Sequence, residues 1–148
     1  IYLGSEYENI MAKEADQIIN DAHQNGMLAV IWIYPRGKNV KNEKSIDILA
    51  GAAGLGLCLG ADFVKLNYPF GSLAKDAEKY KAVVKAAGNT GIICSGGSKV
   101  SETEFLKRIK NQISISGARG AAIGRNLHQN DLKTAINLAK KIKEIVVK

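Results

Sequence analysis

The sequence has few cysteines, few aromatic residues and no long apolar run. Its two cysteines, Cys58 and Cys94, lie in apolar surroundings without CxxC spacing, so we expect two buried thiols in a reducing, cytoplasmic compartment. No stretch approaches the roughly 20 apolar residues of a membrane span, and we expect no membrane partner. His23 and His128 have no second ligand at metal spacing, which predicts surface or packing roles and no metal site.

Negative charge is also scarce, since 21 lysines and arginines outnumber 14 acidic residues and leave a formal net charge of +7. The excess favours an anionic partner. The lysines are scattered, without a compact basic motif or an aromatic stacking platform, so nucleic acid is not the expected partner. A phosphorylated small molecule suits such a dispersed positive field.

Apolar runs alternate with helical stripes along the whole chain. The sequence lacks an initiator Met and opens on residues 1–4, which predict the end of a strand and a chain that is part of a longer one. Further strands are predicted at 27–34, 61–69, 91–95 and 117–124. Helices are predicted from residues 5, 45, 72, 101 and 130 or 131, the first and fourth with capping boxes. Three glycines in the second helix, at positions 51, 54 and 56, predict close packing against the sheet.

This order predicts an α/β fold with parallel strands and crossover helices, because the strands are almost continuously apolar. Two architectures fit: an open doubly wound sheet and part of a (β/α)8 barrel. No GxGxxG opens the first helix, and polar residues occur within or at the end of four successive strands, which favours a barrel. At about 30 residues per repeat, the chain would supply a little over half of the barrel.

Lys65 is the unusual residue of the sequence, because it interrupts the apolar strand at 61–69. Burying an ammonium group without a partner is unfavourable, so the site must neutralise it, pair it or use it. A desolvated amine can act as a nucleophile and form a Schiff base. A structural lysine would instead pair with a carboxylate or extend to solvent at the strand end.

Other polar candidates follow neighbouring strands. Trp32 and Tyr34 share one face of the strand at 27–34, where the phenol could act as an acid/base group or both rings could fill the core. Glycines let backbone amides approach an anion, and barrels bind phosphate in their last loops. Two successive strands end in such turns, which contain Ser95, Gly96 and Gly97, and Gly124 and Arg125.

Four segments together resemble the archaeal-type class I fructose-bisphosphate aldolases of the DhnA family, over the whole chain. The resemblance places the chain at strands 4 to 8 of the TIM barrel of that family. The segments are Trp32-Ile33-Tyr34-Pro35-Arg36-Gly37, Asp62-Phe63-Val64-Lys65-Leu66-Asn67-Tyr68-Pro69, Ser95-Gly96-Gly97 and Ala122-Ile123-Gly124-Arg125-Asn126.

The resemblance implies a Schiff base at Lys65, acid/base catalysis by Tyr34 and a pocket shaped by Trp32. It implies reversible cleavage of fructose 1,6-bisphosphate to dihydroxyacetone phosphate and glyceraldehyde 3-phosphate, without metal or cofactor, in a homo-oligomer. The substrate phosphate would bind to Ser95, Gly96, Gly97, Gly124 and Arg125.

Other functions remain open at this point. Related lysine-dependent aldolases and thiolases act on other phosphorylated ketones, and a sugar-phosphate-binding domain without catalysis would need no reactive lysine. Pocket residues from strands 1 to 3 of the family have no counterpart in this sequence. We therefore expect the 148 residues by themselves to be inactive as an aldolase.

Overall fold

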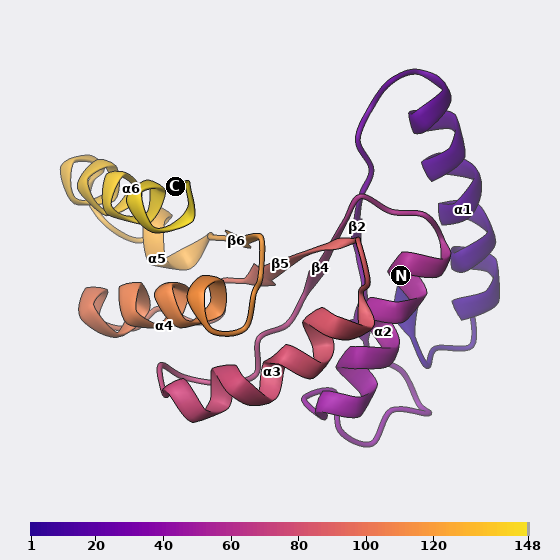
Figure 1. Cartoon of the computed structure of the whole chain (residues 1–148), viewed down its shortest axis with the longest axis horizontal. Coiled ribbons are helices and arrows are strands. Elements are labelled where there is room, and N and C mark those ends of the chain that lie inside the picture. The colour runs from indigo at the N-terminus through magenta and orange to yellow at the C-terminus, as the bar shows by residue number, and fades with distance from the viewer. Residues whose placement is uncertain (148) are drawn as a thin grey trace.

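The computed structural model describes residues 1–147 as strands that alternate with helices (Figure 1). The strands are β1 (Tyr2–Leu3), β2 (Val30–Trp32), β3 (Tyr34–Pro35), β4 (Phe63–Leu66), β5 (Gly91–Ser95) and β6 (Gly120–Ala122). The helices are α1 (Glu8–Gln24), α2 (Ile46–Cys58), α3 (Ala74–Ala86), α4 (Glu102–Ser114), α5 (Arg125–His128) and α6 (Leu132–Val146). Within this part of the chain, no helix combines the length and the apolar character needed to cross a bilayer.

All paired strands are parallel and follow one another in chain order. β2 and β3 form one extended segment that changes partner at Ile33: the Ile33 amide donates to Lys65 O (3.2 Å), and the Tyr34 amide donates to Ile1 O (2.9 Å). The order is therefore β1, β2/β3, β4, β5, β6. A doubly wound sheet would reverse its order at a switch point, whereas a barrel does not. The helices form an arc outside the strands, as in a barrel wall (Figure 1).

The two faces of the β2/β3 segment differ as the alternation of its residues predicts. Ile31 and Ile33 point to the helices and are 9% and 0% exposed. Val30 and Trp32 point to the inside of the arc and are 50% and 56% exposed. The next strand continues the pattern, since Val64 and Leu66 are fully buried on the helix side and Lys65 lies between them.

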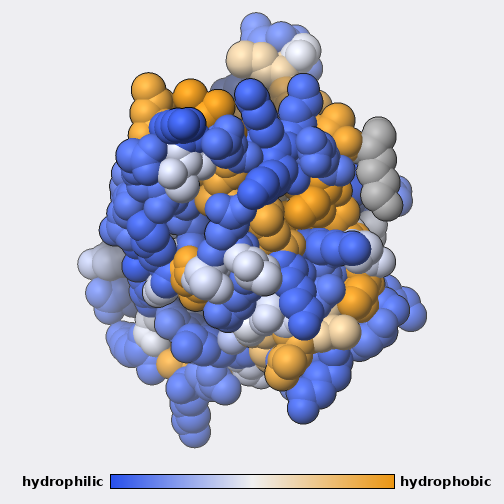
Figure 2. Space-filling view, turned by 90° about the vertical axis from the view of Figure 1, so that its left-hand side faces the viewer, coloured by the Kyte–Doolittle hydropathy of each residue, from blue (hydrophilic) through white to orange (hydrophobic). Residues whose placement is uncertain are grey.

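The core lies between the strands and the helices in two clusters. The first joins α1, α2 and α3 to β2, β4 and β5, and the second joins α4 and α6 through Phe105, Ile109, Leu138 and Ile142. On the side of the molecule that carries α4 and α6, hydrophobic residues also reach the surface (Figure 2).

Three predicted helix starts have different outcomes. Ser101 and Asp131 cap α4 and α6, accepting from the Glu104 amide (3.3 Å) and the Thr134 amide (3.0 Å). The capping box predicted at Ser5 is wrong, because α1 begins only at Glu8. Glu8 accepts from the Gly4 amide at 2.5 Å, so its carboxylate holds the turn that follows β1.

Two further predictions need correction. Cys58 was expected to be buried, but it lies exposed in the last turn of α2, and only Cys94 is buried. The four-residue helix α5 was not predicted, since its residues look like a polar loop after the last strand. This helix carries Arg125 at its first position and therefore changes how that residue is presented.

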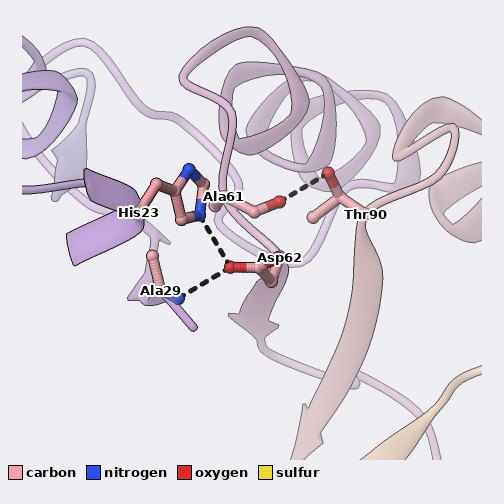
Figure 3. Close-up of polar contacts among 5 residues, drawn as sticks. All are labelled: His23, Ala29, Ala61, Asp62 and Thr90. Atoms are coloured by element: carbon pink, nitrogen blue, oxygen red, sulfur yellow. Dashed lines mark hydrogen bonds and ion pairs between the residues drawn. The ribbon is translucent and has the colours of Figure 1, made fainter. Parts of the chain in front are cut away.

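The amino-terminal ends of the strands are fastened by hydrogen bonds (Figure 3). The Asp62 carboxylate accepts from the Ala29 amide (2.7 Å) and contacts His23 Nε2 (2.9 Å), which joins α1, β2 and β4. The Thr90 hydroxyl donates to Ala61 O (2.9 Å), which joins β5 to the same end. The Ala29 amide, and then His23, hold the pKa of Asp62 below its usual range. In barrel folds the amino-terminal ends of the strands contribute to stability, whereas active sites lie at their carboxyl-terminal ends.

Candidate active site

A cavity of about 320 Å³ lies at the carboxyl ends of the strands, where barrel enzymes place their active sites. Its volume falls in the range of small-molecule sites. Seven of the eight residues proposed from the sequence line it: Tyr34, Lys65, Ser95, Gly96, Gly97, Gly124 and Arg125. The eighth, Trp32, lies beside the cavity and contacts Lys65.

Lys65 is held by two aromatic side chains of the neighbouring strand segment. Its Nζ donates a hydrogen bond to Tyr34 Oη (2.6 Å) and lies 3.6 Å from the centre of the Trp32 ring. The residue is only 9% exposed, and no carboxylate in residues 1–147 pairs with it. Because parallel pairing sets Trp32 beside Lys65, the register of β2 and β4 creates this arrangement directly.

The next position along the strands forms a polar rim. Ser95 Oγ donates to Asn67 Oδ1 (3.1 Å), and the buried Tyr80 hydroxyl donates to Asn67 O (3.0 Å). Cys94 points the other way into the core, where burial raises the pKa of its thiol to about 12. The thiol is therefore poorly suited to act as a nucleophile.

The Ser95-Gly96-Gly97 turn crosses closely over the end of β6. The Gly96 amide donates to Ala122 O (2.8 Å), and a side chain at this position would approach that oxygen to 3.0 Å. The Gly96 amide is thus already used within the fold. Gly97 follows with a φ of +69°, a conformation that glycine adopts without strain.

Sequence reasoning missed residues that line or support this cavity. His128 lines it from α5, and Arg108 and Asn126 hold the glycine turn from behind. No sequence signal identified Arg108, because it lies within the amphipathic pattern of α4 and looks like an ordinary helix residue. For Asn126, its place directly after Gly124-Arg125 was the available signal.

Other sites are less suited to polar chemistry. A larger cavity of about 510 Å³ lies between α1 and β2, but its lining is apolar apart from Glu14. Within residues 1–147, no three His, Cys, Asp or Glu side chains are grouped as metal ligands.

Comparisons with known proteins agree with this arrangement. The profile described as DeoC/LacD family aldolase matches residues 1–130. The fructose-bisphosphate aldolase/6-deoxy-5-ketofructose 1-phosphate synthase of Methanocaldococcus jannaschii is 54% identical over 99% of this chain and 47% of its own length. The class 1 fructose-bisphosphate aldolase of Thermoproteus tenax is 37% identical over 99% of this chain and 53% of its own length. The chain thus spans about half the length of these relatives.

Solved structures show the same fold. A fructose-bisphosphate aldolase from Slackia heliotrinireducens superposes with a TM-score of 0.92 at 49% identity, over 99% of this chain and 47% of that one. An archaeal fructose-1,6-bisphosphate aldolase, whose catalytic Lys is covalently bound to the carbinolamine intermediate of the substrate, superposes with a TM-score of 0.85 at 36% identity. The match covers 99% of this chain and 55% of that one. The prediction of a partial barrel and the resemblance to archaeal class I aldolases are therefore confirmed. This chain belongs to the DeoC/LacD family of aldolases.

Proposed function

We propose that this chain carries the Schiff-base site of a class I aldolase that cleaves fructose 1,6-bisphosphate reversibly. The observation that carries the proposal is the contact of Lys65 with the phenol of Tyr34 and the ring of Trp32, in a cavity lined by two glycine turns. A buried lysine without a carboxylate partner is held for chemistry rather than for a salt bridge.

In the proposed reaction, Lys65 Nζ attacks the C2 carbonyl of the ketose and forms a carbinolamine, which loses water to give a protonated imine. The C3–C4 bond then breaks, its electron pair moves into the imine, and the C4 hydroxyl loses its proton as glyceraldehyde 3-phosphate leaves. Proton return to C3 and hydrolysis free dihydroxyacetone phosphate and the lysine. Tyr34, in contact with Nζ, is the proposed acid/base group for the proton transfers at the C4 hydroxyl and at C3.

Trp32 contributes electrostatically in this mechanism. The π face of its ring lies over Lys65 Nζ at 3.6 Å, at the position where the nitrogen of the protonated imine would carry its charge. An indole ring is the most favourable aromatic partner of a cation. The same contact therefore holds the free ammonium and stabilises the charged intermediate.

The phosphate next to the ketone would bind at the two glycine turns. Within the described part of the chain, the amides of Gly97, Gly124 and Arg125 donate no hydrogen bond, and the Arg125 side chain lines the cavity. These groups are the proposed phosphate ligands, together with the Ser95 hydroxyl, which would turn from Asn67 Oδ1 to donate to the phosphate. Gly96 contributes shape, because its amide donates to Ala122 O and a side chain there would come within 3.0 Å of that oxygen.

The domain and assembly proposals rest on the fold and the family. We propose that residues 1–148 are the carboxyl-terminal part of a single barrel domain, since β1 and β6 each have one partner strand. A cytoplasmic homo-oligomer is proposed on the family resemblance, with a small phosphorylated sugar as ligand.

A second candidate function shares the site. The name of the Methanocaldococcus jannaschii relative includes 6-deoxy-5-ketofructose 1-phosphate synthase, and that relative is 54% identical to this chain. Both products carry a phosphate on the carbon next to a ketone, so the same lysine enamine would serve and only the second aldehyde would differ. A substrate screen with different aldehydes and dihydroxyacetone phosphate distinguishes the two.

Borohydride trapping tests the proposal. With dihydroxyacetone phosphate, reduction of the imine should attach the ligand to Lys65, and Lys65→Met should lose both the label and turnover. Lys85→Met, which changes an exposed lysine of α3, is the matched control and should keep both. A sugar-phosphate-binding protein without catalysis would bind the ligand equally well after Lys65→Met, and a label on another lysine would contradict the assignment.

A further inference from the structure

Arg108 is a buried cation that the proposed reaction does not use. It lies on α4, is 8% exposed, and stacks over the Phe105 ring with its guanidinium carbon 5.2 Å from the ring centre. No carboxylate in residues 1–147 forms a salt bridge with it. Burial lowers the pKa of Arg108, and the charge of the exposed Glu104, one turn earlier on α4, opposes that shift. A buried guanidinium that lacks a salt bridge is unfavourable unless other groups compensate its charge.

The guanidinium is directed at the first glycine turn. Arg108 Nη2 donates to Gly96 O (2.6 Å), and Asn126 Nδ2 approaches the same oxygen (3.4 Å) and donates to Ser98 O (3.1 Å). Asn126 is 3% exposed, and its Oδ1 accepts from the Val100 amide (3.0 Å). Because Asn126 belongs to α5, this contact also ties the turn after β6 to the turn after β5.

These contacts fix the direction of the peptide between Gly96 and Gly97. The peptide is trans, so its N–H points opposite to its carbonyl. With Gly96 O held against Arg108, the Gly97 amide is turned away from α4, toward the cavity that both glycines line. Arg108 Nη1 lies close to Gly97 as well, 3.6 Å from the position that a Cβ atom on Gly97 would take.

We propose that Arg108 is a positioning residue for the phosphate group of the substrate. It orients the Gly97 amide as a donor, and it places a positive charge behind the turn, which favours binding of the phosphate dianion. Asn126 keeps the Gly124-Arg125 turn in register with the first turn, so that the two turns act as one anion site. This inference rests on the proposed function, and it concerns ligands with a phosphate next to the reacting ketone.

The test compares two ketones in the intact protein by borohydride trapping at Lys65. Dihydroxyacetone phosphate carries the phosphate, and dihydroxyacetone lacks it. For Arg108→Met we expect the half-saturating concentration of dihydroxyacetone phosphate to rise by about tenfold or more, since hydrogen bonds to charged groups are the strong ones. The value for dihydroxyacetone should stay within about twofold. Arg108→Lys, which keeps the charge, should recover part of the loss, and Lys107→Met, an exposed neighbour on α4, should change neither value.

The possible outcomes separate the inference from the proposed function. Equal half-saturation values before and after the substitution, or an equal rise for both ketones, would show a purely structural role and overturn the inference. If Arg108→Met does not fold, Arg108→Lys provides the test. An Arg108→Lys protein whose preference for dihydroxyacetone phosphate over dihydroxyacetone is the same as that of the unsubstituted protein, over the full range of concentrations, would also overturn the inference. Absence of any label at Lys65 in the unsubstituted protein would overturn the proposed function, and the inference with it.

Discussion

Replacing Tyr34 by Phe isolates the chemistry of the phenol from its packing. The substitution removes one oxygen, which accepts the hydrogen bond from Lys65 Nζ at 2.6 Å. The ring remains, with its centre 5.2 Å from Nζ, as does the Trp32 ring at 3.6 Å. The folded state therefore loses a single hydrogen bond from a charged donor, and we expect the free energy of unfolding to fall by about 1.5–3 kcal/mol.

The effect on catalysis should be larger. A positioned acid/base group contributes about 10²- to 10⁴-fold to a rate, so we expect turnover to fall by that factor, or about 2.7–5.5 kcal/mol in the activation barrier. Trapping of dihydroxyacetone phosphate at Lys65 should persist, because the nucleophile and its π partner are retained. Thus cleavage and imine formation respond differently, which a loss of folding cannot mimic.

The assay measures fructose 1,6-bisphosphate cleavage, borohydride trapping and urea unfolding on the same preparations. Tyr7→Phe is the matched control, since Tyr7 is 60% exposed and precedes α1. Turnover of Tyr34→Phe within about threefold of the unsubstituted protein would refute the acid/base assignment. Equal loss of turnover and trapping would refute it too, because the phenol would then serve only to place the lysine.

Two further predictions concern stability. Gly56→Ala would overlap Cγ2 of the fully buried Val64, so the overpacking cost of about 1–3 kcal/mol should outweigh the gain in helix propensity of about 1 kcal/mol. Gly51→Ala has open space around it and should stabilise the protein by up to that gain. Urea unfolding measures both variants, and a Gly56→Ala protein more stable than the Gly51→Ala protein would contradict the prediction. Asp62→Asn should destabilise most above the usual carboxyl pKa of 3.8. The folded pKa is lowered, so the stabilisation is present above the unfolded pKa and is lost as pH falls through the folded pKa. Unfolding at pH 7 and at acid pH checks this, with Asp16→Asn on the surface of α1 as control; a difference between Asp62→Asn and the unsubstituted protein that grows toward acid pH would contradict it.

The strand and helix order could be predicted from the sequence because the local signals agree with the tertiary structure. Apolar runs bounded by glycine became strands, and the caps at Ser101 and Asp131 formed as expected. The prediction at Ser5 failed although its spacing to Glu8 fits a capping box, because the Glu8 carboxylate accepts from the Gly4 amide in the turn after β1 instead. The glycines of α2 show the same limit, since only Gly56 meets the sheet and no local pattern distinguishes it from Gly51.

The proposed site was found from the sequence where its residues stand in unlikely places. A lysine inside an apolar run and glycine turns after two successive strands are visible without a structure. Parallel strands bring their carboxyl ends to one edge, which is why seven of the eight residues line one cavity. Arg108 could not be found in this way, because its role depends on the distance from α4 to a carbonyl oxygen 12 residues earlier in the chain.

Lys65 and Arg108 have similar surroundings. Each is a buried cation, and in the described part of the chain neither forms a salt bridge with a carboxylate. A carboxylate beside Lys65 would favour the ammonium form, which is not nucleophilic, and one beside Arg108 would compete with a bound anion. Aromatic rings and carbonyl or phenol oxygens hold both groups instead. We propose that the site thus leaves both positive charges for a ligand, and a phosphorylated ketone is the kind of ligand that would use them together.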